Sequence, residues 1–534
     1  MTVIDLGTYF ENEIRAFLIS VGFTDVPPPR GEGKKERFFL GGQEIDAFGR
    51  DGDLYVVVDA KTRTSLTSKG RNVRQHLSVI NGYKDEVIGD IKNRYGAKYG
   101  YRDAVFIFWT KDIRIEKEHQ ERGTELGIAL RDDFDLEYYA EALGILKNKE
   151  VVRNSFLKDI NLQLPGLVVF SEGHSINAKA IRIRVGAKTL YTFPIEVGHL
   201  LKFAYVFRVE MNSILGASYQ RLLKEKKVNK IREYLGTGGY FPNNLIAVSE
   251  EKIEFTPEKG EVNEHAPFTL GELRLLNKPC YLEIIDGQHR LYSYSNQPGR
   301  QSHCLWVTIV EGLSPVDRAK LFVTINKTQT PVPPDILWDL YQISEPDKIR
   351  GRISKFVYEL NEVDPLRDLI SLPRIRSSRA YLSFSNLCAA FHVRAYLFSE
   401  YGSEASFKNV VRAYFEAISN DPDIKVDWDR SISKKGKKGF ICTNNSVSVL
   451  LRLLAKVLRR TKLPPSEKIQ SWKEHLNGWV IIPLREYLAE NTIGDKTDPY
   501  QELRKLTSEG ARKDAANEIW AKSPFSDPNV KVEY

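Results

Sequence analysis

Hydrophobic positions in the first 150 residues alternate between a helical and an extended spacing. Apolar side chains between residues 8 and 21 recur three to four positions apart, which predicts an amphipathic helix. Strands are expected after it at 37–40, 44–49, 54–60, 104–110 and 127–130, followed by an acidic helix at 133–146. Val56-Val57-Val58 is a continuous apolar run, which is typical of a strand covered on both faces. Residues 1–150 are therefore predicted to form a compact α/β domain.

The periodic pattern weakens over 151–166, where we expect a linker, and then resumes. The elements predicted next are a helix at 219–235, strands at 282–285 and 305–310, and a helix at 315–326. Helical spacing then dominates, at 348–359, 383–399, 407–418, 446–459 and 470–490. The chain is thus predicted to be an α/β multidomain protein, with a second domain at 167–345 and a mostly helical region at 346–534.

The composition of the 534 residues is that of a folded, water-soluble protein, with 42% hydrophobic and 28% charged residues. No uncharged apolar run reaches the roughly 18 residues that a membrane crossing needs, so no membrane association is expected. Asp5, Glu11 and Glu13 stand where a secretory signal would carry lysine and an apolar core. Four cysteines without CxxC spacing argue against a zinc ribbon or a disulfide framework, so a reducing, cytoplasmic location is expected.

The net charge of +8 is concentrated in the last third of the chain. Residues 346–534 contain 32 Lys and Arg against 24 Asp and Glu, whereas the preceding two parts nearly balance. This excess could hold a polyanion. A solvated surface with a mild lysine bias is the alternative explanation.

The most chemically suggestive stretch of the first domain joins two predicted strands by an Asp-Gly turn. Asp46 lies on the first strand and Asp59 on the second, while Lys61, two positions further on, shares a face with Asp59. Such charges are costly together unless a metal or substrate neutralises them, and Mg²⁺ prefers carboxylates plus water and phosphate oxygens. The alternative is an exposed hairpin that carries a surface ion pair of little energetic weight.

With the helix before it, this arrangement resembles the PD-(D/E)xK nuclease superfamily, particularly its Mrr-like and archaeal Holliday-junction resolvase branches. The resemblance covers about residues 8–110 and implies a restriction-endonuclease-like fold. It assigns metal binding to Asp46 and Asp59 and a catalytic role to Lys61. A glutamate on the first helix often joins the metal ligands of the family, and Glu11 is the candidate here, with Glu13 behind it.

A second candidate site follows the strand at 282–285. Asp286-Gly287-Gln288-His289-Arg290 places a glycine turn, a histidine and an arginine at a predicted helix start, where backbone N–H groups and a guanidinium favour phosphate. A purely structural use of His289 and Arg290 is the alternative, with Asp286 as the carboxylate partner. No GxxxxGK[ST] sequence occurs, which excludes a P-loop nucleotide hydrolase.

This pentapeptide and its flanks resemble the DGQHR-domain family, which includes the B protein of the Dnd DNA phosphorothioation system, and more distantly the ParB/sulfiredoxin fold. Gln220-Arg221 opens the first matching block, and Asn326 lies in the last. The resemblance implies a ParB-like α+β domain with a nucleotide or DNA-phosphate pocket. The residues it assigns to that pocket are Gln220, Arg221, Asp286, Gly287, Gln288, His289, Arg290 and Asn326.

Together these resemblances predict a metal-dependent endodeoxyribonuclease coupled to a DGQHR module, in a prokaryotic DNA-modification or phage-defence system. The expected cofactor is Mg²⁺ or Mn²⁺, with a nucleoside triphosphate as a further candidate ligand. DNA, other components of the system and a second copy of the chain are the expected partners. Two alternatives stay open: a non-catalytic DNA-binding transcriptional regulator, and a ParB-like nucleotide hydrolase that assists DNA modification.

Overall fold

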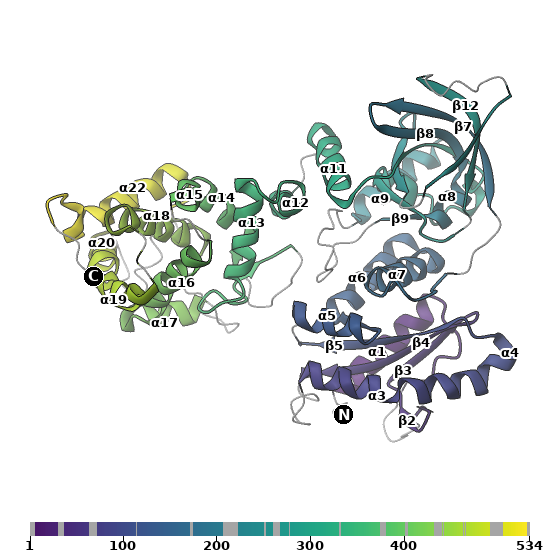
Figure 1. Cartoon of the computed structure of the whole chain (residues 1–534), viewed down its shortest axis with the longest axis horizontal. Helices are drawn as coiled ribbons and strands as arrows, with labels where there is room; N and C mark the ends of the chain where they lie inside the picture. The colour runs from purple at the N-terminus through teal and green to yellow at the C-terminus, as the bar shows by residue number, and fades with distance from the viewer. Residues whose placement is uncertain are drawn as a thin grey trace. The chain divides into compact units, whose positions relative to one another are not determined.

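The computed structural model describes residues 6–29, 37–63, 72–113, 115–170, 175–206, 223–249, 252–259, 267–276, 278–329, 333–373, 381–400, 404–431, 441, 443–462, 464, 466–491 and 506–530. The chain forms two compact units, Met1–Ile325 and Asn326–Tyr534. Within the described ranges, no helix is both long and apolar enough to cross a membrane. The architecture is a mixed α/β multidomain fold (Figure 1).

The first unit begins with a four-stranded sheet that is covered on both faces. Its strands are β3 (Ala47–Asp51), β4 (Leu54–Thr62), β5 (Asp103–Lys111) and β6 (Ile128–Asp132). They lie in the order β3-β4-β5-β6, with β3 antiparallel to β4 and the other pairs parallel. Before them, β1 (Phe39–Leu40) and β2 (Gln43–Glu44) form a short antiparallel pair. These strands lie at the predicted positions, except that the one expected at 44–49 is divided between β2 and β3, with Asp46 between them.

The two faces of this sheet pack against different helices because strand side chains alternate. Val56 and Val58 join the core that contains α1 (Leu6–Ser20), whereas Tyr55 and Val57 join the core that contains α3 (Val73–Ile91). Further elements of this region are η1 (Lys92–Gly96), α4 (Ala97–Tyr99) and α5 (Lys117–Glu125). The continuous apolar run of β4 is thus explained by burial on both sides.

The segment expected as a linker is a buried helix. After α6 (Asp133–Leu146), α7 runs over Lys149–Gln163, and its Phe156 stacks on Trp109 with ring centroids 5.8 Å apart. The apolar pattern looked weak because two polar side chains on this helix, Asn154 and Asp159, are also buried. The Asp159 carboxylate accepts a hydrogen bond from the Tyr139 hydroxyl, which explains how it is tolerated in the core.

A second, eight-stranded mixed sheet completes the first unit. Its order is β11-β12-β7-β8-β14-β10-β13-β9, with parallel pairs only at β14-β10 and β13-β9. The strands are β7 (Ile176–Val185), β8 (Lys188–Glu196), β9 (Ala204–Tyr205), β10 (Leu245–Ser249), β11 (Glu254–Pro257), β12 (Phe268–Leu275), β13 (Leu282–Asp286) and β14 (Cys304–Glu311). The helices among them are α8 (Val197–Phe203), α9 (Glu225–Gly236), α10 (Gln288–Tyr292) and, after the sheet, α11 (Pro315–Gln329).

The two domains predicted at 1–150 and 167–345 share one hydrophobic core, in which α6 and α7 lie between the sheets (Figure 1). Polar contacts also join them. Arg232 on α9 donates from Nη2 to the Ile145 carbonyl oxygen at 2.8 Å. The Ser295 hydroxyl donates to the Leu146 carbonyl oxygen at 2.7 Å. The first unit, Met1–Ile325, contains the first predicted domain and most of the second, so these two form a single compact body. It ends before the predicted boundary at 345.

The second unit is mainly helical, as predicted. Its helices are α12 (Pro334–Ser344), α13 (Ile349–Leu360), α14 (Phe384–His392), α15 (Tyr396–Glu400), α16 (Glu404–Asn420), α17 (Pro422–Ser431), α18 (Asn444–Thr461), α19 (Ile469–Leu476), α20 (Ile482–Asn491) and α22 (Glu509–Ala521). A short parallel pair, β15 (Ile370–Ser371) and β16 (Leu382–Ser383), precedes α14. The predicted helix at 446–459 is the middle of α18, whose apolar face is buried in the core of this unit.

Candidate functional site

The charged side chains of Asp46, Asp59 and Lys61 meet near the C-terminal end of β4. The Lys61 Nζ lies between two carboxylates: it donates to Asp46 Oδ2 at 2.7 Å and to Asp59 Oδ1 in a short contact. The Ala60 backbone N–H donates to the same Asp46 oxygen at 2.8 Å. All three charged side chains are largely buried, so the alternative of an exposed surface ion pair does not describe them.

The hairpin brings these residues together as the sequence predicts. Gly52, at a φ of 62°, allows the tight turn between β3 and β4. The register pairs Ala47 with Val58, so Asp46 lies directly before the strand, opposite Asp59. Asp59 and Lys61 are two positions apart in β4 and share the face that α3 covers.

Helix α3 contributes two further side chains that sequence reasoning missed. His76 Nε2 lies 3.1 Å from Asp59 Oδ1, and the Tyr83 hydroxyl donates to Asp59 Oδ2 at 3.2 Å. The two residues are seven positions apart, so they lie on the same side of the helix, two turns from each other. That spacing in α3 is the signal in the sequence that could have identified them.

Burial and charge act in opposite directions on the two aspartates. Burial raises the pKa of Asp46, and the Lys61 charge only partly opposes this effect. Burial would also raise the pKa of Asp59, but the Lys61 charge and the His76 hydrogen bond outweigh it and hold that pKa below the usual range. Although burial lowers the pKa of Lys61, the charges of Asp59 and Asp46 outweigh it and raise that pKa. Lys61 is therefore a protonated cation at neutral pH.

This balance predicts a particular pH dependence of stability. The pKa of Asp59 is lower in the folded chain than the value of about 3.9 expected when unfolded. Asp59 therefore stabilises the fold above about pH 4, and this stabilisation decreases as the pH falls towards the folded pKa. We expect wild-type β4 amides to exchange hydrogen more slowly than those of Asp59→Asn at pH 7, with the difference shrinking below pH 4. An equal difference from pH 3 to pH 7 would contradict the assignment.

Glu11 does not join the two aspartates in one group. Arg15, one turn after Glu11 on α1, donates from Nε to the Asp46 carbonyl oxygen at 2.8 Å, so this side of α1 faces the start of β3. Glu13 forms an ion pair with Lys111 at 2.9 Å. Across the described ranges, no three His, Cys, Asp or Glu side chains are arranged to hold a metal ion.

The residues present nevertheless fit a divalent cation held by two carboxylates. Oxygen atoms of Asp46 and Asp59 both contact one Nζ atom, so they already converge on a single positive charge. Mg²⁺ typically uses one or two carboxylates and completes its shell with water and phosphate oxygens. Asp46 and Asp59 would hold such a cation, which would supply positive charge beside that of Lys61.

The DGQHR segment adopts the predicted strand–turn–helix geometry, but its charges are paired internally. Arg290 Nη2 donates to Asp286 Oδ2 at 2.9 Å, and its Nη1 donates to the Asn243 carbonyl oxygen at 2.7 Å. Gly287 has a φ of +97°, and α10 after it is only five residues long. The Arg290–Asp286 pair is what we expect if the motif serves only the structure. A helix of five residues is not an anion site by itself.

The remaining residues assigned to this pocket are not brought into one open site. Gln288 and His289 are buried, and His289 Nε2 lies 3.5 Å from the Lys224 backbone nitrogen that donates to it. Gln220, Arg221 and the side chain of Asn326 lie outside the described residues. Their predicted roles stay predictions.

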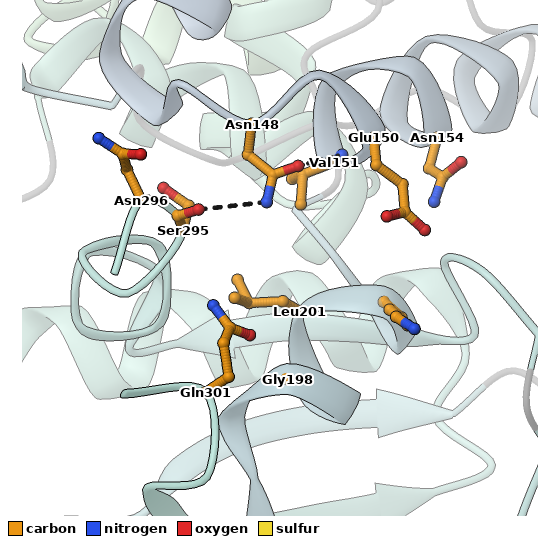
Figure 2. Close-up of a pocket in the computed structure, with 10 residues that line it drawn as sticks. Asn148, Glu150, Val151, Asn154, Gly198, Leu201, Ser295, Asn296 and Gln301 are labelled. Atoms are coloured by element: carbon orange, nitrogen blue, oxygen red, sulfur yellow. Dashed lines mark hydrogen bonds between the residues drawn. The ribbon is translucent and has the colours of Figure 1, made fainter. Parts of the chain in front are cut away.

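A pocket of about 300 Å³ lies at the junction between α7 and the second sheet region (Figure 2). Most of its lining residues are polar, and they include Asn148, Glu150, Asn154, Lys202 and Gln301. Asn148 is committed to structure, because its amide donates to the Ser295 carbonyl oxygen at 3.2 Å and its Oδ1 accepts from the Val151 N–H. The sequence does not predict this pocket, because its pattern over 151–166 predicts a linker where the structure has α7.

Comparison with known proteins gives a family match for one part of the chain. Residues 178–297 match the DndB family, which is described as DNA-sulfur modification-associated. The match contains the Asp286–Arg290 motif and confirms the predicted resemblance for this segment, and it associates the segment with DNA-modification systems. No curated protein and no solved structure matches the chain. The nuclease resemblance of the first domain, the restriction-endonuclease-like fold and the ParB-like fold stay predictions.

Proposed function

We propose that the chain is a metal-dependent endodeoxyribonuclease that acts in a DNA-modification system. The observation that carries the proposal is the convergence of Asp46 and Asp59 on Lys61, in a partly enclosed site backed by His76 and Tyr83. Family association with DNA-sulfur modification, over residues 178–297, supports DNA as the substrate.

Each side chain has a role that follows from its contacts. Asp46 and Asp59 would hold Mg²⁺ or Mn²⁺, and the bound cation would supply charge neutralisation at a phosphodiester and an acidified water. His76 and Tyr83 fix the orientation of the Asp59 carboxylate through their hydrogen bonds. Lys61 would place a positive charge at the site and stabilise negative charge on the phosphodiester.

Plasmid cleavage by the purified full chain tests this proposal. We expect nicking or linearisation in Mg²⁺ or Mn²⁺ and none in EDTA, because the carboxylates need the cation. Phosphorothioate-modified and unmodified plasmids, compared side by side, would show whether sulfur in the backbone directs cleavage. Lys117→Met, which changes an exposed lysine on α5, should cleave as the wild type does. Intact DNA of both kinds under every metal condition would contradict the proposal.

The second candidate is a DNA-binding regulator without catalysis. The internal pairing of Asp286 with Arg290 favours it, since that motif then stabilises the fold instead of holding a nucleotide. A gel-shift experiment that detects specific DNA binding, together with no cleavage of any substrate, would favour the regulator. Nucleotide turnover that is lost in Arg290→Ala but kept in Lys61→Met would favour the nucleotide hydrolase instead.

A further inference from the structure

A cluster of cationic side chains lies on the helical second unit, whereas the sites described above belong to the first unit. We name it the basic cluster, and its members are Arg394, Arg452, Lys456, Arg459 and Arg512. Three of them follow one another on α18 at spacings of four and three residues, which places them along one side of the helix. Arg394 lies between α14 and α15, and Arg512 lies on α22; both α14 and α22 pack against α18.

The positive charge of the basic cluster is poorly compensated. Glu509 is its one carboxylate partner among the described residues, and Arg452 and Arg512 share it. No described carboxylate lies within ion-pair distance of Arg394, Lys456 or Arg459. The guanidinium of Arg459 lies over the Tyr396 ring at 4.9 Å, a contact that leaves its charge in place.

Arg394 is the most constrained member. Its exposed fraction is only 5%, and its guanidinium donates to the Ala390 carbonyl oxygen one turn earlier. Burial and then the charge of Arg452 lower its pKa to about 10, while Tyr396 partly offsets this effect. Burying a cation without a carboxylate is costly, so a bound anion would stabilise this arrangement.

We propose that the basic cluster binds phosphate groups of a nucleic-acid backbone. Guanidinium forks match the oxygen pairs of phosphate, which is why arginine dominates such sites. The stripe from Arg452 to Arg459 is about 10 Å long at the helical rise per residue. That length exceeds a single phosphate and fits a backbone with one phosphate per roughly 3.4 Å along each strand. The site lies in the second unit, so it goes beyond the proposed nuclease centre and does not depend on it.

Binding of a fluorescent DNA duplex by the full chain, in EDTA and over a salt series, tests the inference. The variant Lys456→Gln/Arg459→Gln removes two cations that are not fully buried, so the fold should be kept. We expect affinity to fall at least about fivefold for every duplex sequence, and the salt slope to decrease by about 1.8. Arg412→Gln, an exposed arginine on α16, is the matched control and should leave both unchanged.

Wild-type affinity and salt slope in the double variant, at an unchanged melting temperature, would overturn the inference. Loss of mononucleotide binding with intact duplex binding would also overturn it, because the site would then serve a free nucleotide. Since EDTA prevents metal-dependent cleavage, the outcome does not depend on whether the chain is a nuclease. A chain that fails to cut DNA and still shows the expected change in salt slope would retract only the nuclease proposal.

Discussion

Replacing Lys61 by methionine is expected to reduce plasmid cleavage at least about a hundredfold. The substitution keeps most of the side-chain volume and removes the positive charge that contacts both Asp46 and Asp59. The site would then lack the ammonium group that stabilises the charge developing on a substrate phosphodiester. Initial cleavage rates in Mg²⁺ for the variant and the wild type are the measurement.

Stability provides the control for this prediction. Removing one partner of a buried charge cluster costs about 3–5 kcal/mol, so Lys61→Met should also speed hydrogen exchange in β4 and α3. Asp46→Asn/Lys61→Met removes the remaining repulsion between the two carboxylates and should restore much of that protection while cleavage stays lost. A folded Lys61→Met protein that cleaves at the wild-type rate would show that this lysine has no part in the reaction.

The charged hairpin was predictable because its determinants are local. Period-two alternation, a turn glycine and three charges within sixteen positions fix the relation between Asp46, Asp59 and Lys61. The contributions of His76 and Tyr83 depend on how α3 crosses the sheet, which no local pattern specifies. Three of the five residues of the candidate site were therefore predictable from the sequence, and the two that orient Asp59 were not.

Helix α7 and the junction were missed for a different physical reason. The pattern rules assume that polar residues face solvent, yet Asn154 and Asp159 are buried where two sheet regions share a core. The shared core also makes the boundary between the two predicted domains hard to predict, because no exposed polar segment separates them. Sequence patterns identify isolated amphipathic faces well, whereas an element buried on several sides loses its periodic signal.

The second large effect is expected at Gly287, in the turn between β13 and α10. Its φ of +97° is strained for any L side chain, and an added Cβ would lie 2.9 Å from Leu245 Cγ and 3.0 Å from Arg290 Nη2. Gly287→Ala must therefore displace Leu245 or break the contact between Arg290 and Asp286. We expect a loss of about 2–4 kcal/mol in local stability, measured as faster hydrogen exchange in β10, β13 and α10.

Two further glycines separate the causes of that loss. Gly186 also has a positive φ, at 59°, but its Cβ would meet no atom within 4 Å, so Gly186→Ala reports backbone strain alone. Gly299 has neither constraint, so Gly299→Ala should be nearly neutral. If Gly287→Ala lowers local stability no more than Gly186→Ala does, the Asp286–Arg290 pair has rearranged freely. The motif then does not stabilise the fold. A clear excess at Gly287 means that this pair is a rigid structural element, and any ligand of the motif must bind without breaking it.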